Sequence, residues 1–200
     1  MLELDTLPLV PHYAAKPLDP VTWPDFARLV EQHNGVWGGC WCMGFHAKGP
    51  GWGKSASLNR AEKKALVTEG RAHAALVYDG EECVGWCQFG PTAELPRIKS
   101  LKAYEAGLSA LPNWRITCFF VARKYRGRGV AAAALGGALA EIARLGGGVV
   151  ESYPDDLPDE KLARGFGHNA TVAMFERRGF KRQRQIAKHR WVVVRHVEAA

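Results

Sequence analysis

The hydrophobic and polar residues of this chain alternate with two different periods. A period near 3.6 is typical of a helix with one buried face, and a period of two is typical of a strand. The helical pattern is found in four segments, residues 23–32, 59–69, 129–145 and 169–178. Asn59 and Glu62 have the spacing of a capping box, so we expect Asn59 to be the N-cap of the second helix. In the third helix, Gly136 and Gly137 cost about 1 kcal/mol each relative to alanine, which indicates a helix packed very close to a sheet.

Strand patterns follow the second helix. They predict strands at residues 74–78, 83–89, 116–121, 149–153, 180–186 and 190–197. Asp79-Gly80 joins the first two as a hairpin, and residues 91–113 are expected to be irregular because they contain three prolines. The strand, helix and strand between residues 116 and 153 require a parallel pair with a right-handed crossover. We therefore predict a mixed α/β sheet in which the remaining strands pair antiparallel.

The composition places the chain among ordinary globular proteins. With 200 residues, 47% hydrophobic and 24% charged, it is expected to form a single domain over residues 1–200. Five cysteines, an odd number, argue against a disulfide scaffold. The opening MLELDTLPLV lacks the apolar core of a secretory signal, and no run approaches the ~18–20 apolar residues of a membrane span. We expect a cytoplasmic protein with no membrane partner.

The charge balance favours an anionic partner. There are 27 basic and 20 acidic residues, a formal net charge of +7. One basic cluster lies in the six residues 123–128, and a second lies between residues 177 and 190. The acidic run at residues 154–160 would repel a polyanion, so a uniform nucleic-acid face is not the first interpretation.

A glycine-containing turn between the strand 116–121 and the next helix carries the strongest chemical signal. Gly127 and Gly129 permit backbone conformations and close approaches that a Cβ would block. The amides of the turn and of the helix start, with nearby cations, form a cradle suited to phosphate or pyrophosphate. The alternative is a glycine turn whose arginines are merely solvated. A P-loop is absent, and a dinucleotide fingerprint would need a glycine where Ala132 stands.

Two motifs resemble the GNAT superfamily of acetyl-CoA-dependent N-acetyltransferases. The first is its R/Q-x-x-G-x-G/A signature, which is similar to Arg126, Gly127, Arg128, Gly129, Val130 and Ala131. The second is a helix ending in Gly-Phe, which is similar to residues 173–180. The element order from residue 21 to 197 fits the same fold. The resemblance implies a mostly antiparallel sheet with a central, splayed parallel strand pair, flanked by helices.

The resemblance also implies a site. The pantetheine arm of acetyl-CoA would bond to the backbone near Phe120 and Val121, and the pyrophosphate would lie on the amides of residues 126–131. A neutral primary amine would attack the thioester directly in a ternary complex. Many family members carry a proton-donating tyrosine four residues before the glycine of the second motif. Phe175 occupies that position here, in the expected cofactor site, so another group donates the proton or the thiolate leaves unprotonated.

Glu151 and Tyr153 are the catalytic candidates. They alternate onto one face of their strand at the expected splay. The alternatives are a surface carboxylate paired with an arginine, and a half-buried strand aromatic. Glu94 and His168 also carry acid–base groups, but a capping or solvated role is the simpler interpretation of each.

The loop between the first two helices, at about residues 35–54, is rich in glycine, tryptophan and cysteine. By the resemblance it borders the acceptor site, so Trp37, Cys40, Trp41 and Cys42, with Trp52 further along, are candidates for an acceptor pocket. Cys40, Cys42 and His46 have the pattern C-x-C-x₃-H, but a structural zinc site needs four ligands and wider spacing. We expect no metal.

Other functions stay open at this point. The missing tyrosine leaves room for a non-catalytic domain that binds or senses CoA, and the basic clusters leave room for a nucleic-acid-binding module. The final strand, 190–197, is hydrophobic and would support a homodimer if it lay at a sheet edge. The identity of the acceptor amine cannot be read from the sequence.

Overall fold

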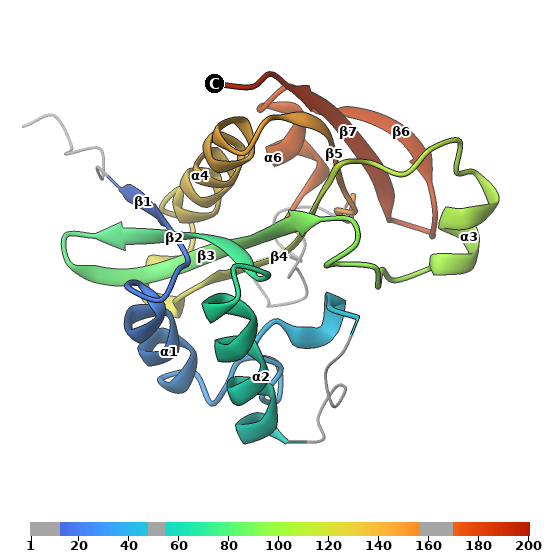
Figure 1. The fold of residues 1–200 in the computed structure, drawn as a ribbon. Helices are drawn as coiled ribbons and strands as arrows, with labels where there is room; N and C mark the ends of the chain where they lie inside the picture. Colours follow the sequence, from blue (N-terminus) through green and yellow to red (C-terminus); the bar gives the residue numbers. More distant parts are fainter. Residues whose placement is uncertain (1–12, 48–54, 157–169) are drawn as a thin grey trace, which may run out of the picture.

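A computed structural model describes residues 13–47, 55–156 and 170–200. A seven-stranded sheet with the order β1-β2-β3-β4-β5-β7-β6 forms its centre (Figure 1). The strands are β1 (Ala14–Pro17), β2 (His73–Asp79), β3 (Glu82–Pro91), β4 (Trp114–Val121), β5 (Gly148–Ser152), β6 (Lys181–Gln185) and β7 (Trp191–Val197). Among the described strands, β4 and β5 are the one parallel pair, and the other neighbours are antiparallel. The predicted mixed, mostly antiparallel sheet is confirmed.

Helices cover both faces of the sheet (Figure 1). They are α1 (Trp23–Glu31), α2 (Ala56–Thr68), α3 (Leu101–Ala106), α4 (Val130–Arg144) and α6 (Val172–Glu176), with short 3₁₀ turns at Met43–Phe45 and Arg123–Tyr125. α4 packs on β1, β2 and β3 from one side. α1 approaches from the opposite side, where Phe26 meets the Trp86 ring of β3 edge-on with centroids 5.0 Å apart.

The start of α2 differs from the prediction. The helix begins after Ser55, whose hydroxyl accepts a hydrogen bond from the Leu58 amide at 3.3 Å. Asn59 is therefore not the N-cap. It is buried inside the helix and donates to the Gly39 carbonyl at 2.8 Å, which ties α2 to the segment that follows α1. Asparagine is typical of helix N-caps, but here its side chain makes a long-range hydrogen bond instead.

The elements β1 and α3 were not predicted, and the final strand, β7, does not lie at the sheet edge that was considered for it. β1 is short and lies at the surface, and α3 lies within the proline-containing segment 91–113. The final strand does not lie at an edge, because β7 pairs with β5 on one side and with β6 on the other. The edge strand on this side of the sheet is β6, whose sequence KRQRQ is charged and discourages pairing with another chain. β7 therefore offers no free strand edge for pairing with another chain.

The parallel pair is short, and this shapes the centre of the molecule. β4 and β5 pair at Trp114↔Val150, Arg115↔Glu151 and Ile116↔Ser152. β4 continues to Val121 and stays paired with β3 along its other side. Within the described residues, the part of β4 from 117 to 121 thus has no partner on its β5 side. This is the splay that the family resemblance implied.

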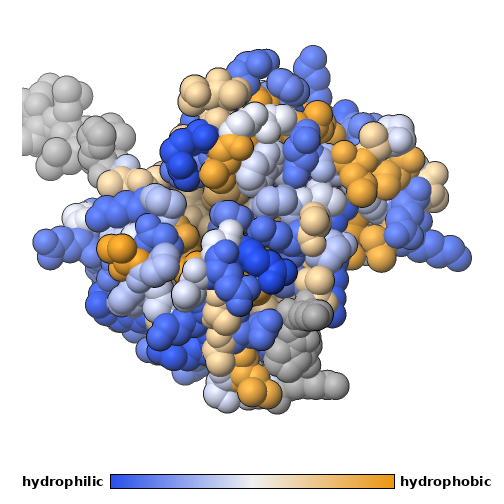
Figure 2. Space-filling view, in the orientation of Figure 1, coloured by the Kyte–Doolittle hydropathy of each residue, from blue (hydrophilic) through white to orange (hydrophobic). Residues whose placement is uncertain are grey.

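The surface facing the viewer in Figure 2 is mainly hydrophilic, with separate hydrophobic patches. Within the described part of the chain, no helix combines the length and the apolar character that a membrane span requires.

The two glycines inside α4 give a test of the packing. A Cβ on Gly137 would lie 2.6 Å from the Ala15 Cβ and 3.1 Å from the Ala75 Cβ, whereas a Cβ on Gly136 would have its nearest neighbour at 3.6 Å. Gly137→Ala is expected to lower the free energy of unfolding by about 1–3 kcal/mol through overpacking. Gly136→Ala, the matched control, should raise it by up to about 1 kcal/mol. Urea unfolding measures both, and equal effects of the two variants would contradict the close packing.

Candidate active site

The turn before α4 exposes backbone amides. Gly127 and Gly129 have φ values of +74° and +85°, a region that L-residues with a side chain rarely adopt. Gly129 is the N-cap of α4, and the Ala133 amide makes the first helical bond by donating to the Gly129 carbonyl at 3.0 Å. The amides before Ala133 have no partner within the helix. A Cβ at either glycine would meet nothing within 4 Å, so this side of the turn is open. The arrangement suits an anion.

The cations of this turn are not equivalent. The Lys124 ammonium lies 3.0 Å from Glu82, which also accepts a hydrogen bond from the Tyr125 hydroxyl at 2.9 Å. The hydrogen bond from Lys124 lowers the pKa of Glu82, so this carboxylate stays charged and offsets the Lys124 charge. Arg126 is exposed, and its Nε donates to the Val121 carbonyl at 3.4 Å. Of these cations, Lys124 is thus already paired with a carboxylate.

Aromatic rings pack on both faces of the splayed part of β4. The Phe120 ring stacks on Trp86 with centroids 4.7 Å apart, on the α1 side. The Phe119 ring points the other way and meets Phe175 of α6 edge-on at 5.9 Å. Phe175 also contacts Phe180 and is fully buried. Phe175 therefore packs against the splayed part of β4 from the α6 side, and its side chain offers no proton donor.

Glu151 and Tyr153 lie together in a buried polar network. The Tyr104 and Tyr153 hydroxyls donate to the same Glu151 oxygen at 2.8 and 3.0 Å. Arg115 donates to the Tyr104 hydroxyl at 3.3 Å and stands opposite Glu151 in the β4–β5 register. Glu151 is only 3% exposed, so the alternative of a surface carboxylate is wrong. Burial raises the pKa of both tyrosines, which therefore keep their protons at neutral pH.

Sequence reasoning missed Tyr104 and Arg115. Tyr104 lies in the segment that was expected to be irregular, and Arg115 directly precedes the predicted strand 116–121. The role of Arg115 becomes visible only in the strand register, because Arg115 stands opposite Glu151 in the parallel β4–β5 pair. Of the other acid–base candidates, Glu94 lies 3.3 Å from His73, and His168 is outside the described residues.

The tryptophan and cysteine segment is mostly interior. Trp41 stacks on Trp23 with centroids 5.9 Å apart, and Cys40 and Cys42 are also buried. Trp37 is 40% exposed. Trp52 lies outside the described residues. Of the proposed acceptor residues, Trp37 is thus the one at the surface. Within the described ranges, no group of three or more His, Cys, Asp or Glu is placed to hold a metal ion.

A second polar network joins α2 to the splay. The Lys63 ammonium nitrogen lies 2.9 Å from the Gln88 side-chain oxygen and 3.2 Å from His46 Nε2. The Gln88 amide in turn donates to the Thr117 hydroxyl at 3.2 Å. Thr117 is the first β4 residue beyond the pairing with β5. Lys63 is 1% exposed, and burial lowers its pKa. The sequence pattern did not indicate that Lys63 is buried, because a lysine on an amphipathic helix normally faces water.

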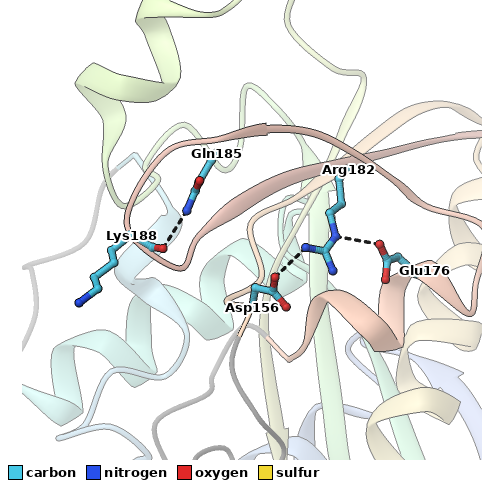
Figure 3. A network of polar contacts seen from close by, with 5 residues as sticks. All are labelled: Asp156, Glu176, Arg182, Gln185 and Lys188. Atoms are coloured by element: carbon cyan, nitrogen blue, oxygen red, sulfur yellow. Dashed lines mark hydrogen bonds and ion pairs between the residues drawn. The ribbon is translucent and has the colours of Figure 1, made fainter.

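Two arginines of the second basic cluster are paired with carboxylates. Arg182 of β6 lies 2.6 Å from Asp156 and 2.8 Å from Glu176, as Figure 3 shows. Arg190 lies 3.0 Å from Asp155. The start of the acidic run thus pairs with arginines of the C-terminal part, which weakens the case for a nucleic-acid face.

Comparison with known proteins agrees with this geometry. The family described as "Acetyltransferase (GNAT) family" matches residues 43–180, and the chain belongs to that family. Members of this family are acetyltransferases that use acetyl-CoA.

Solved structures share the fold. A GNAT-family protein from Desulfovibrio desulfuricans is 14% identical with a TM-score of 0.54, covering 92% of this chain and 99% of that one. An N-acetyltransferase from Staphylococcus aureus is 10% identical with a TM-score of 0.51, covering 93% and 98%. An acetyltransferase from Thermus thermophilus is 14% identical with a TM-score of 0.50, covering 94% and 98%. A search of the curated proteins finds no match.

His46 makes the stability of this site depend on pH. Burial lowers the pKa of His46 to about 2, whereas an unfolded histidine titrates near 6.5. Above pH 6.5 the ring is neutral in both states, and as the pH falls only the unfolded state takes up the proton. The free energy of unfolding should therefore fall by about 2 kcal/mol between pH 6.5 and 5 on account of His46. Urea unfolding at both pH values measures this loss.

The matched variants are His46→Gln and His196→Gln. His46→Gln should remove most of the extra loss on acidification, whereas exposed His196 should leave it unchanged. A His46→Gln protein with the same pH dependence as the wild type would contradict a neutral, buried His46.

Proposed function

We propose that this protein transfers the acetyl group of acetyl-CoA to a primary amine, by direct attack of the amine within a ternary complex. One observation carries the proposal. The unpaired edge of β4 ends at the open glycine turn that begins α4. An extended arm can add to a strand edge, and a pyrophosphate can rest on a helix N-terminus.

The residues then have separate roles. The backbone of Phe120 and Val121 would bind the pantetheine arm, and the amides of residues 127–131 would bind the pyrophosphate, with Arg126 and Arg128 supplying charge. Phe175 would act on the bound arm indirectly, because its ring packs on Phe119 of β4. A backbone N–H of β4 would polarise the acetyl carbonyl as negative charge develops on its oxygen.

Proton transfer is assigned to Glu151 and Tyr153. A buried phenol that keeps its proton is a suitable donor to the departing CoA thiolate. The carboxylate to which it is hydrogen-bonded can take a proton from the incoming ammonium group. Phe175 of α6 has no hydroxyl group, so we assign this pair the role that the tyrosine has in the family pattern.

The competing function is a domain that binds CoA without turnover. Fully buried Phe175 favours it, because no phenol is available at that position. The two functions differ in one observable. A catalyst releases free CoA thiol when acetyl-CoA is incubated with a panel of primary amines, and a pure binder releases none.

CoA should stabilise the protein through the turn. Ligand at 100 times its Kd contributes about 2.7 kcal/mol, which corresponds to a rise in Tm of roughly 5–11 °C for a chain of this size. Pantetheine, which lacks the pyrophosphate, should give a much smaller shift at equal concentration. Gly129→Ala should lose most of the CoA shift, because its methyl group occupies the open side of the turn. Thermal unfolding with each ligand measures these shifts.

Gly70→Ala is the matched control. Gly70 also has a positive φ, +68°, and open space around its Cβ position, but it follows α2. Both variants carry a similar backbone strain of about 1–2 kcal/mol, so only the ligand-induced shift should differ. Equal shifts for CoA and pantetheine, or a full CoA shift in Gly129→Ala, would overturn the assignment of the turn.

The proton-transfer pair is tested by turnover. Glu151→Gln and Tyr153→Phe should each lower kcat by about 10²-fold or more while leaving the CoA-induced shift in Tm unchanged. Tyr104→Phe also removes one hydrogen bond to Glu151, but its ring comes from α3, and it should lower kcat by less than about tenfold. A large, equal loss in all three variants would indicate that the network has a structural role only.

A further inference from the structure

Two cysteines from distant parts of the chain meet at the splay. The sulfur atoms of Cys42 and Cys118 lie 3.4 Å apart, although the residues are 76 positions apart in sequence. Cys118 belongs to the part of β4 that has no β5 partner, and Cys42 ends the segment between α1 and the Met43–Phe45 turn. Both thiols are free and almost fully buried. Proximity at this distance brings the two sulfurs within reach of a covalent bond.

The two thiols have different surroundings. The Trp86 indole N–H donates to the Cys42 sulfur at 3.2 Å, and the Cys42 and Cys118 sulfurs share a hydrogen bond. The hydrogen bond with Cys118 lowers the pKa of Cys42, and the charge of Lys63 acts in the same direction. The same hydrogen bond, together with burial, raises the pKa of Cys118. Cys42 is thus the nucleophile of the pair, and Cys118 is its partner.

The backbone at Cys42 is held in an unusual conformation. Trp41 and Cys42 have φ values of +49° and +54°, and Val36, which is β-branched, has +50°. Such residues store conformational strain. A disulfide needs a sulfur–sulfur distance of about 2.05 Å, so the sulfurs must approach from 3.4 Å. The strained segment can supply this movement more readily than β4, which is hydrogen-bonded to β3 at this point.

We propose that Cys42 and Cys118 form an oxidation site, at which a small hydroperoxide converts the two thiols into a disulfide. The Cys42 thiolate attacks a peroxide oxygen, the O–O bond breaks, and Cys42 becomes a sulfenic acid while hydrogen peroxide yields one water. The Cys118 thiol then attacks the Cys42 sulfur, and its proton leaves with the second oxygen as water. Two thiols and one hydrogen peroxide thus give one disulfide and two waters.

The proposal does not depend on acetyl transfer. The disulfide would join the segment after α1 to the unpaired part of β4, next to Phe119 and Phe120. It would close a long loop of the chain and so restrict the unfolded state, which should raise Tm by roughly 10 °C.

The test uses the reduced, full-length protein and hydrogen peroxide. After a short exposure to about one equivalent, remaining thiols are blocked, and the digest is mapped by mass spectrometry without reduction. The expected result is a cross-linked peptide pair containing Cys42 and Cys118, a fall from five free thiols to three, and recovery of all five with dithiothreitol. Tm should rise in the oxidised protein and return on reduction.

Variants separate this pair from the other thiols. Cys42→Ser and Cys118→Ser should each lose the cross-link, whereas Cys87→Ser, at another fully buried cysteine, should keep it. The mapping of the wild-type protein is decisive even where a variant folds poorly. Free glutathione in the same sample serves as the control for peroxide activity. Three results would overturn the proposal: a sulfinic acid at Cys42 without a cross-link, a bridge between Cys40 and Cys42, or five unreacted protein thiols in a sample whose glutathione has been oxidised.

Discussion

The early end of the pairing between β4 and β5 is the constraint on which the rest of this structure depends. Pairing reaches Ile116 and Ser152, and the Ser152 hydroxyl caps it by donating to the Ile116 carbonyl at 2.9 Å. Beyond that point β4 offers backbone groups on one side without a β5 partner. Unpaired strand groups in the interior of a sheet need another partner, and the proposed partner is the extended arm of CoA. The Phe119 and Phe120 rings pack on opposite faces of β4 in the part that β5 no longer accompanies.

The polar groups of the interior gather around the same point. The Glu151 network lies at the last paired residues, and the Lys63 network reaches Thr117, the first unpaired one. Each network brings charge into a region that burial makes costly unless every partner is placed. Both networks lie at the splay and not in the core under α4. The free-energy cost of burying their charges is therefore incurred beside the proposed site of acetyl transfer.

The local features of the site could be predicted from the sequence, and its long-range contacts could not. The turn at Gly127 and Gly129 and the close packing of α4 at Gly137 follow from glycine chemistry within a few residues. The splay was implied by the family resemblance. Tyr104, Arg115 and Lys63 were missed because their partners lie on other elements, and their residue types are common on surfaces. Asn59 was misassigned for the same reason, since its contact with Gly39 outweighs its local capping preference.

The most direct test of the account is amide hydrogen exchange with and without CoA. If the arm of CoA lies along β4 and its pyrophosphate lies on the turn, CoA should slow exchange in two stretches together, residues 117–121 and 127–132. Peptides from the edge strand β6 should exchange at the same rate in both samples. Protection of β6 and β7 without protection of either stretch, or protection of the turn alone, would contradict the central claim that the unpaired edge of β4 is the binding edge.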